Sequence, residues 1–145
     1  MRPPFPFAIA LGCALLLSGC AGLSGGLPPY GKPVTQAQLV GMWKGSWRNI
    51  CHATLMLRSD HSLSATGFPT DDDDAHRLEA IRRVSGTGTW MISPGVDKGD
   101  PPTLDLTIGA TGDSLDFAAG HGGTLVLAAT IGDPDDGVGC RFTRT

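Results

Sequence analysis

Short runs in which apolar and polar residues alternate one by one recur along the chain beyond residue 40, and they limit the possible folds more than any other feature. In one such run Leu104, Leu106 and Ile108 alternate with Asp105 and Thr107. Successive side chains of a strand point to opposite faces, so this period of two predicts a strand with one buried face. About eight such runs follow one another, separated by stretches of Gly, Pro, Asp and Ser that favour turns. The sequence therefore predicts an all-β fold, a single antiparallel meander of about eight short strands.

The predicted meander removes its two unpaired edges most simply by closing into a small barrel, which makes the first and last strands neighbours. The 21 Gly and 11 Pro residues argue against a helical bundle, because both destabilise helix interiors. Residues 70–83 interrupt the alternation, with four aspartates at 71–74 preceding Arg82 and Arg83. Charges in this order suit a short helix and suit equally a charged loop over one barrel mouth. Both interpretations stay open at this point.

The first residues look like an export signal. Phe7 to Leu17 are mostly apolar, which is too short for a membrane-spanning helix but typical of a signal peptide. The stretch ends in Leu17-Ser18-Gly19-Cys20, which resembles the lipobox of bacterial lipoproteins. The resemblance implies a signal peptide at 1–19, cleavage before Cys20, and acyl chains on Cys20 that anchor the protein to a membrane of the bacterial cell envelope. An ordinary secretory signal peptide that happens to end in cysteine is the alternative.

The same resemblance implies a domain organisation and a location. Residues 20–34 form the lipidated cysteine and a flexible Gly- and Pro-rich tether, and residues 35–145 form the barrel domain. Residue 21 is Ala rather than Asp, which in the lipoprotein pattern does not signal retention in the inner membrane. We therefore expect the outer membrane if the host has two membranes.

Two of the four cysteines belong to the mature domain if the lipobox resemblance holds. Cys13 then leaves with the signal peptide and Cys20 carries lipid, which leaves Cys51 and Cys140. Two remaining thiols in an exported chain predict one disulfide. A pair of buried free thiols is the alternative.

The start of the predicted barrel resembles the opening of lipocalin-like barrels. Residues 35–38 are suited to a brief helical turn, and Gly41-Met42-Trp43 and Gly45-Ser46-Trp47 both match the Gly-x-Trp of a first strand. In that family the Trp plugs the closed end of the barrel. The segments at 86–90 and 132–135 resemble small bacterial lipoproteins of the same kind. The domain is shorter than a full-length lipocalin, so we expect short strands and a small cavity.

The sequence offers no constellation that we would assign to catalysis, metal binding or a cofactor. The histidines at 52, 61, 76 and 121 lack metal-ligand spacing, and no nucleophile elbow or phosphate-binding loop occurs. Asp105 and Asp116 are predicted on the outward face, where water would leave them ordinary. A net charge of −3 argues against nucleic acid as a partner. We therefore expect a protein that is not an enzyme.

Two functions from different classes fit these features. The first is a ligand-binding module whose barrel holds a small apolar or lipid-like molecule, with these lining candidates: Trp43, Trp47, Leu55, Leu57, Trp90, Leu104, Leu106, Phe117, Leu125 and Leu127. The second is a structural or protein-interaction lipoprotein, such as an inhibitor or an assembly accessory. Its barrel would be filled by side chains, and its outer loops, especially residues 71–83, would contact an envelope protein.

Overall fold

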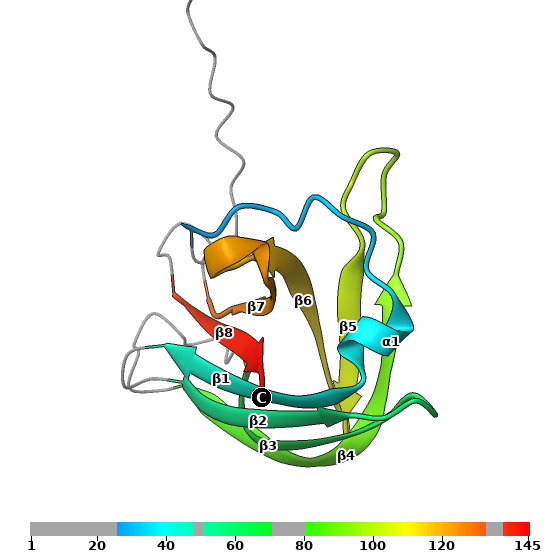
Figure 1. Ribbon diagram of the computed structural model, residues 1–145. Helices are drawn as coiled ribbons and strands as arrows, with labels where there is room; N and C mark the ends of the chain where they lie inside the picture. The colour runs from blue at the N-terminus through cyan, green and yellow to red at the C-terminus, as the bar shows by residue number, and fades with distance from the viewer. Residues whose placement is uncertain (1–25, 48–50, 71–80, 133–137) are drawn as a thin grey trace, which may run out of the picture.

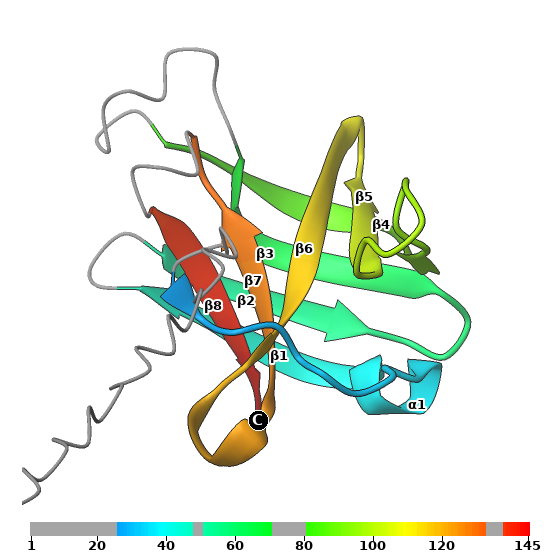
Figure 2. The same cartoon turned by 90° about the horizontal axis from the view of Figure 1, so that it is seen from above.

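The computed structural model of the protein describes residues 26–47, 51–70, 81–132 and 138–145. Within them eight antiparallel strands form one closed barrel in simple sequence order, which confirms the predicted fold class (Figures 1 and 2). The elements are α1 (Gln36–Leu39), β1 (Gly41–Trp47), β2 (Cys51–Leu57), β3 (Ser62–Thr70), β4 (Arg82–Ser93), β5 (Thr103–Ile108), β6 (Thr111–Ala119), η3 (His121–Gly123), β7 (Leu125–Thr130) and β8 (Gly139–Arg144). None of the helices in this part of the chain is long and apolar enough to cross a bilayer.

The barrel closes between its first and last strands, as the meander predicted. Trp43 lies opposite Arg144 and Gly45 lies opposite Phe142 in the antiparallel pairing of β1 with β8. This register places the C-terminal end of the chain beside α1. We call this the α1 end of the barrel; the β2–β3 turn, the β4–β5 loop and the β6–β7 loop also lie there.

The disulfide predicted from the cysteine count is present, so the free-thiol alternative is wrong. Cys51, at the start of β2, is bonded to Cys140 in β8, and their Cα atoms are 5.6 Å apart. The two strands flank β1, and Gly45 of β1 makes room for the bridge. A Cβ atom at Gly45 would lie 2.7 Å from Cys140 Sγ and 2.6 Å from Phe142 Cε1. The bond fastens the end of the barrel opposite α1.

The strand β7 departs from the predicted one-sided burial. Val126 and Ala128 should face solvent by alternation, yet both are buried with Ala118 in a small cluster outside the barrel wall. Leu27 packs against this cluster. The outer face of β7 is apolar because the chain before the barrel covers it.

Part of the segment predicted to be a tether, 20–34, pairs with the barrel. Its described residues lie along β6, where the Ala119 N–H donates to Pro28 O (2.8 Å) and the Tyr30 N–H donates to Phe117 O (2.9 Å). Pro29 forms an isolated bridge with Ala118. We call residues 26–34 the strap; it continues toward α1 across the top of the view in Figure 1.

The interrupted segment at 70–83 is only partly described. Thr70 ends β3, and Arg82 and Arg83 belong to the first residues of β4. The two arginines therefore start a strand and do not end a helix, which corrects one basis for the helical interpretation. The choice between helix and loop falls on residues 71–80, which lie outside the described residues.

Candidate functional site

Most of the side chains predicted to line a ligand cavity pack against one another in the barrel core. These are Trp43, Leu55, Leu57, Trp90, Leu104, Leu106, Phe117 and Leu127, all buried. Trp47 and Leu125 are half-buried and pack against the same cluster. Aromatic rings of Phe68 and Phe142 stack within it, with centroids 5.8 Å apart. The inward apolar positions were therefore predicted correctly, and their side chains fill the interior where they meet.

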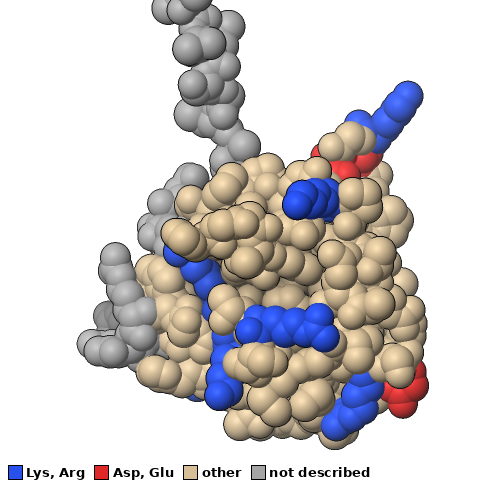
Figure 3. Space-filling model, in the orientation of Figure 1, with Lys and Arg blue, Asp and Glu red and all other residues tan. Residues whose placement is uncertain are grey.

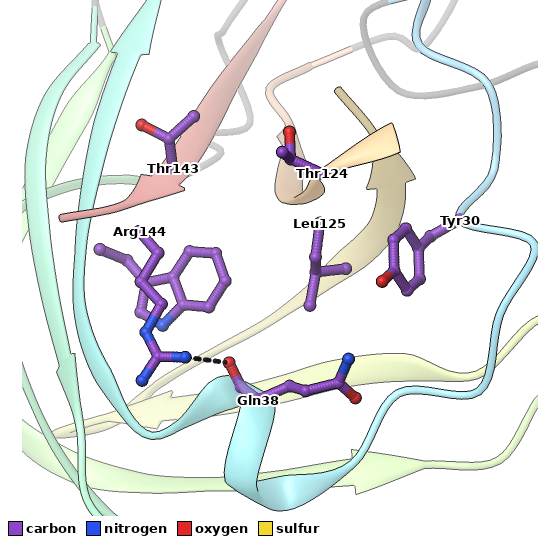
Figure 4. A pocket seen from close by; sticks show the side chains of 7 residues that line it. Tyr30, Gln38, Thr124, Leu125, Thr143 and Arg144 are labelled. Carbon is purple, nitrogen blue, oxygen red and sulfur yellow. Dashed lines mark hydrogen bonds between the residues drawn. The ribbon is translucent and has the colours of Figure 1, made fainter. Parts of the chain in front are cut away.

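A pocket of about 500 Å³ lies at the α1 end, and two of the predicted lining residues reach it (Figure 4). We call it the α1 pocket. Its walls come from the strap, α1, β1, the start of β7 and the end of β8, through Tyr30, Gln38, Trp43, Thr124, Leu125, Thr143 and Arg144. Segments far apart in the sequence meet here because the barrel closes β8 onto β1 and the strap crosses to α1.

Hydrogen bonds hold the aromatic wall of the α1 pocket in place. Trp43 Nε1 donates to the carbonyl oxygen of Leu39 at 2.7 Å, and both residues are buried. The turn that presents Leu39 is itself closed by the Thr35 N–H, which donates to Gln38 Oε1 at 2.8 Å. The indole is thus fixed at one wall of the α1 pocket.

Arg144 is the charged residue of the α1 pocket. Its Nη2 donates to Val40 O at 2.7 Å, and its Nη1 donates to Gln38 O at 3.4 Å. The guanidinium thereby ties the last strand to α1 while it stays exposed at the pocket. The sequence analysis did not single out this residue. The pairing of the first strand with the last, which a closed barrel requires, could have indicated it, because that pairing places Arg144 opposite Trp43.

The lining residues combine apolar surface with a positive edge. Leu125 and the rings of Tyr30 and Trp43 offer apolar contact, while two threonines and Arg144 offer donors (Figure 4). On the face shown in Figure 3, basic side chains lie across the middle, and acidic ones appear at its upper right and lower right. The α1 pocket therefore suits a small apolar or amphiphilic molecule, and no acidic side chain lines it among the described residues.

Asp105 was predicted to be exposed to water and to have an ordinary pKa, and both predictions are wrong. Asp105 is half-buried and accepts hydrogen bonds from the hydroxyls of Ser93, Thr103 (3.0 Å) and Ser114 (2.8 Å). These bonds, the one from Ser93 above all, lower the pKa of Asp105 below its ordinary value, against the opposing effect of burial. Alternation along a single strand cannot reveal such hydroxyl donors on the neighbouring strands.

None of the described histidines lines the α1 pocket. His52 and His121 are exposed, His61 lies on the β2–β3 turn, and position 76 lies outside the described residues. Among the described residues no group of three His, Cys, Asp or Glu side chains is arranged to hold a metal ion. Comparison with protein-family models, with curated proteins and with solved structures gives no match to this chain.

Proposed function

We propose that the protein is a lipid-anchored lipoprotein of the bacterial cell envelope, with a lipocalin-like barrel that binds a small apolar or amphiphilic molecule in the α1 pocket. The observation that carries the binding role is the pocket itself, walled by Trp43, Leu125 and Tyr30. Concave sites with mostly apolar walls and a few placed polar groups are the usual form of small-molecule sites. The ligand then sits at the end of the barrel and not in its filled centre.

The anchor is the acylated Cys20, which lies outside the described residues. Several acyl chains hold a protein on a membrane far more durably than one. Only six positions separate Cys20 from Gly26, where the described chain begins. An extended chain of that length reaches about 20 Å at most, so an anchored barrel stays close to the lipid surface. The location is the outer membrane if the host has two membranes.

Mass spectrometry of the protein purified from its own envelope tests the anchor and the ligand separately. The intact mass is expected to match a chain that begins at Cys20 and carries acyl groups. An intact Met1 or an unmodified Cys20 would contradict the anchor. Under native conditions we expect an additional bound small molecule, and consistently empty protein would contradict the binding role.

A pair of variants assigns the bound molecule to the α1 pocket. Thr143 is exposed on β8 and lines the pocket, so Thr143→Trp fills the pocket without entering the core. Thr66 is exposed on β3 and does not line it, so Thr66→Trp is the matched control. We expect Thr143→Trp to lose the bound mass and Thr66→Trp to keep it. Retention by both variants would place the ligand elsewhere.

The filled interior favours a second candidate, a protein-interaction lipoprotein that acts as an inhibitor or an assembly accessory. Its surface includes an exposed apolar side chain, Val96, which is 98% exposed in the β4–β5 loop. A photo-crosslinking residue at position 96 is expected to capture one envelope protein reproducibly, whereas the same residue at exposed Thr87 is not. Equal capture from both positions would count against this candidate.

A further inference from the structure

The turn between β2 and β3 holds His61 in a backbone conformation that favours glycine. The Arg58 N–H donates to Ser62 O (2.9 Å) and the His61 N–H donates to Arg58 O (3.1 Å), which closes a three-residue hairpin loop. His61 has a φ of 67° and is the one non-glycine residue with positive φ in the described chain. This position of such a loop is usually occupied by Gly. A histidine in a conformation that favours glycine suggests a use for its side chain.

The imidazole of His61 is held in one orientation by Trp90. The two rings stack with centroids 4.9 Å apart and an angle of 12° between their planes. Nδ1 lies 3.1 Å from Trp90 O, so it carries the proton that makes this hydrogen bond. Nε2 is then an acceptor in the neutral ring. The ring face turned away from Trp90 is an ordered, flat apolar surface on an exposed residue.

A second pocket of about 500 Å³ lies beside this ring, and we call it the His61 pocket. It is also lined by Trp90 and by side chains of β4 and β5: Thr89, Met91, Asp105 and Thr107. Thr89 pairs with Thr107 and Met91 pairs with Asp105 across the two strands, so these four side chains form one patch. Met91 is 55% exposed, so its side chain is available to a ligand in this pocket.

Hydroxyl groups are frequent on the outer face of the sheet in which the His61 pocket lies, and two of them, on Thr89 and Thr107, line the pocket. Positions on the outer face of β3 to β6 carry Ser62, Ser64, Thr87, Thr89, Ser93, Thr103, Thr107 and Ser114. Three of these hydroxyls donate to Asp105 and thereby fix its carboxylate. A carboxylate has about four acceptor positions, so one is left for a donor from a ligand.

We infer that the His61 pocket binds a neutral saccharide. The Asp105 carboxylate and His61 Nε2 accept hydrogen bonds from sugar hydroxyls, and the hydroxyls of Thr89 and Thr107 both donate and accept. The flat face of the imidazole and the Met91 side chain contact the apolar C–H face of a pyranose ring. No lysine or arginine in the described part of the chain lines this pocket, and the Asp105 carboxylate does, so phosphate, sulfate and carboxylate ligands find no permanent counter-charge. This inference does not depend on the α1 pocket.

The methionine methyl groups provide the test, because one of them lies in the pocket. Full-length protein is prepared with ¹³C-methyl methionine in a detergent whose headgroup contains no sugar. It is titrated with a glucose trisaccharide and, separately, with an N-acetylglucosamine trisaccharide. We expect at least one of the two trisaccharides to cause a saturable shift of the Met91 methyl signal. The trisaccharide that causes the shift defines the class of saccharide that the pocket binds. The Met42 signal, from an exposed residue on β1, should stay unchanged.

Three variants separate recognition from a structural role. Thr107→Val removes one pocket hydroxyl at constant shape, and we expect it to weaken saccharide binding about threefold to tenfold. Thr87→Val removes an exposed hydroxyl of the same sheet outside the pocket and should bind as the unmodified protein does. His61→Gly suits the turn and keeps the fold, but it should abolish the saturable shift. The inference is overturned if neither trisaccharide shifts Met91, if Met42 shifts equally, or if the three variants bind alike.

Discussion

Replacing Gly45 by Ala tests whether the barrel interior is as tightly filled as the packing indicates. The added Cβ would lie 2.6 Å from Phe142 Cε1 and 2.7 Å from Cys140 Sγ, both far inside ordinary contact distance. Phe142 and Cys140 are fully buried, and Phe142 is also stacked on Phe68. Overfilling a core of this kind costs about 1–3 kcal/mol. Restricting the unfolded chain by Gly→Ala offsets about 0.4–1 kcal/mol, so the expected net loss is about 1–2 kcal/mol.

Urea unfolding of the oxidised protein measures this loss. With a slope of about 1.5 kcal/mol per molar urea, the midpoint of Gly45→Ala should fall by roughly 1 M. Gly112→Ala on β6 is the matched control, because the nearest atom to its added Cβ is Leu106 O at 3.9 Å. We expect the control to be neutral or slightly stabilised. A count of free thiols verifies that the disulfide stays formed in both variants.

Coupling with Phe142 sharpens the same test. If the clash with the ring causes the loss, Phe142→Leu should relieve part of it, so the double variant should be more stable than the sum of the single effects by about 1 kcal/mol. Equal midpoints for Gly45→Ala and Gly112→Ala would refute the tight contact at Gly45. If the stability losses of Gly45→Ala and Phe142→Leu are strictly additive, the clash with the Phe142 ring is not the cause of the loss at Gly45.

Three further predictions concern stability. Cys51→Ala with Cys140→Ala opens a loop of 89 residues and should cost about 4–5 kcal/mol in urea unfolding; an unchanged midpoint would contradict this. Because the pKa of Asp105 is lowered in the folded state, its contribution is complete above the unfolded value near 4 and is lost as the pH falls further. The stability of Asp105→Asn should therefore depend less on pH below 4, and parallel curves would contradict this. Arg144→Ala loses its bond to Val40 O and should cost about 1 kcal/mol, whereas Lys44→Ala, exposed on β1, should cost less than half as much.

The strands, their inward faces and the disulfide could be predicted because each depends on a local or countable feature. Leu104, Leu106 and Ile108 are buried as their alternation indicated, since a strand in a barrel wall has one face toward the core. The same rule failed for β7, where Val126 and Ala128 are buried on the outer face beneath Leu27. That burial comes from a segment about a hundred residues earlier in the chain, and periodicity within a strand contains no information about it.

The site residues were harder to predict because they depend on register between distant segments. Trp43 and Leu125 were among the predicted lining residues, but Arg144 joins them only through the closure of β8 onto β1. His61 appeared as one of several scattered histidines. Its interest comes from a positive φ and from its stacking on Trp90, and both are visible only in three dimensions.

The packed core limits where the proposed binding can take place. In a barrel of eight strands the inward side chains suffice to fill the centre, so alternation reveals which residues face inward but not how much space remains. The α1 pocket lies at the end of the barrel opposite the Cys51–Cys140 bond, where the Gln36 side chain donates to Ser59 O of the β2–β3 turn (2.8 Å). The His61 pocket lies instead on the outer face of β4 and β5. The proposed ligand site in the α1 pocket is therefore built from loops and strand ends that a packed barrel positions, which is the usual division between scaffold and site.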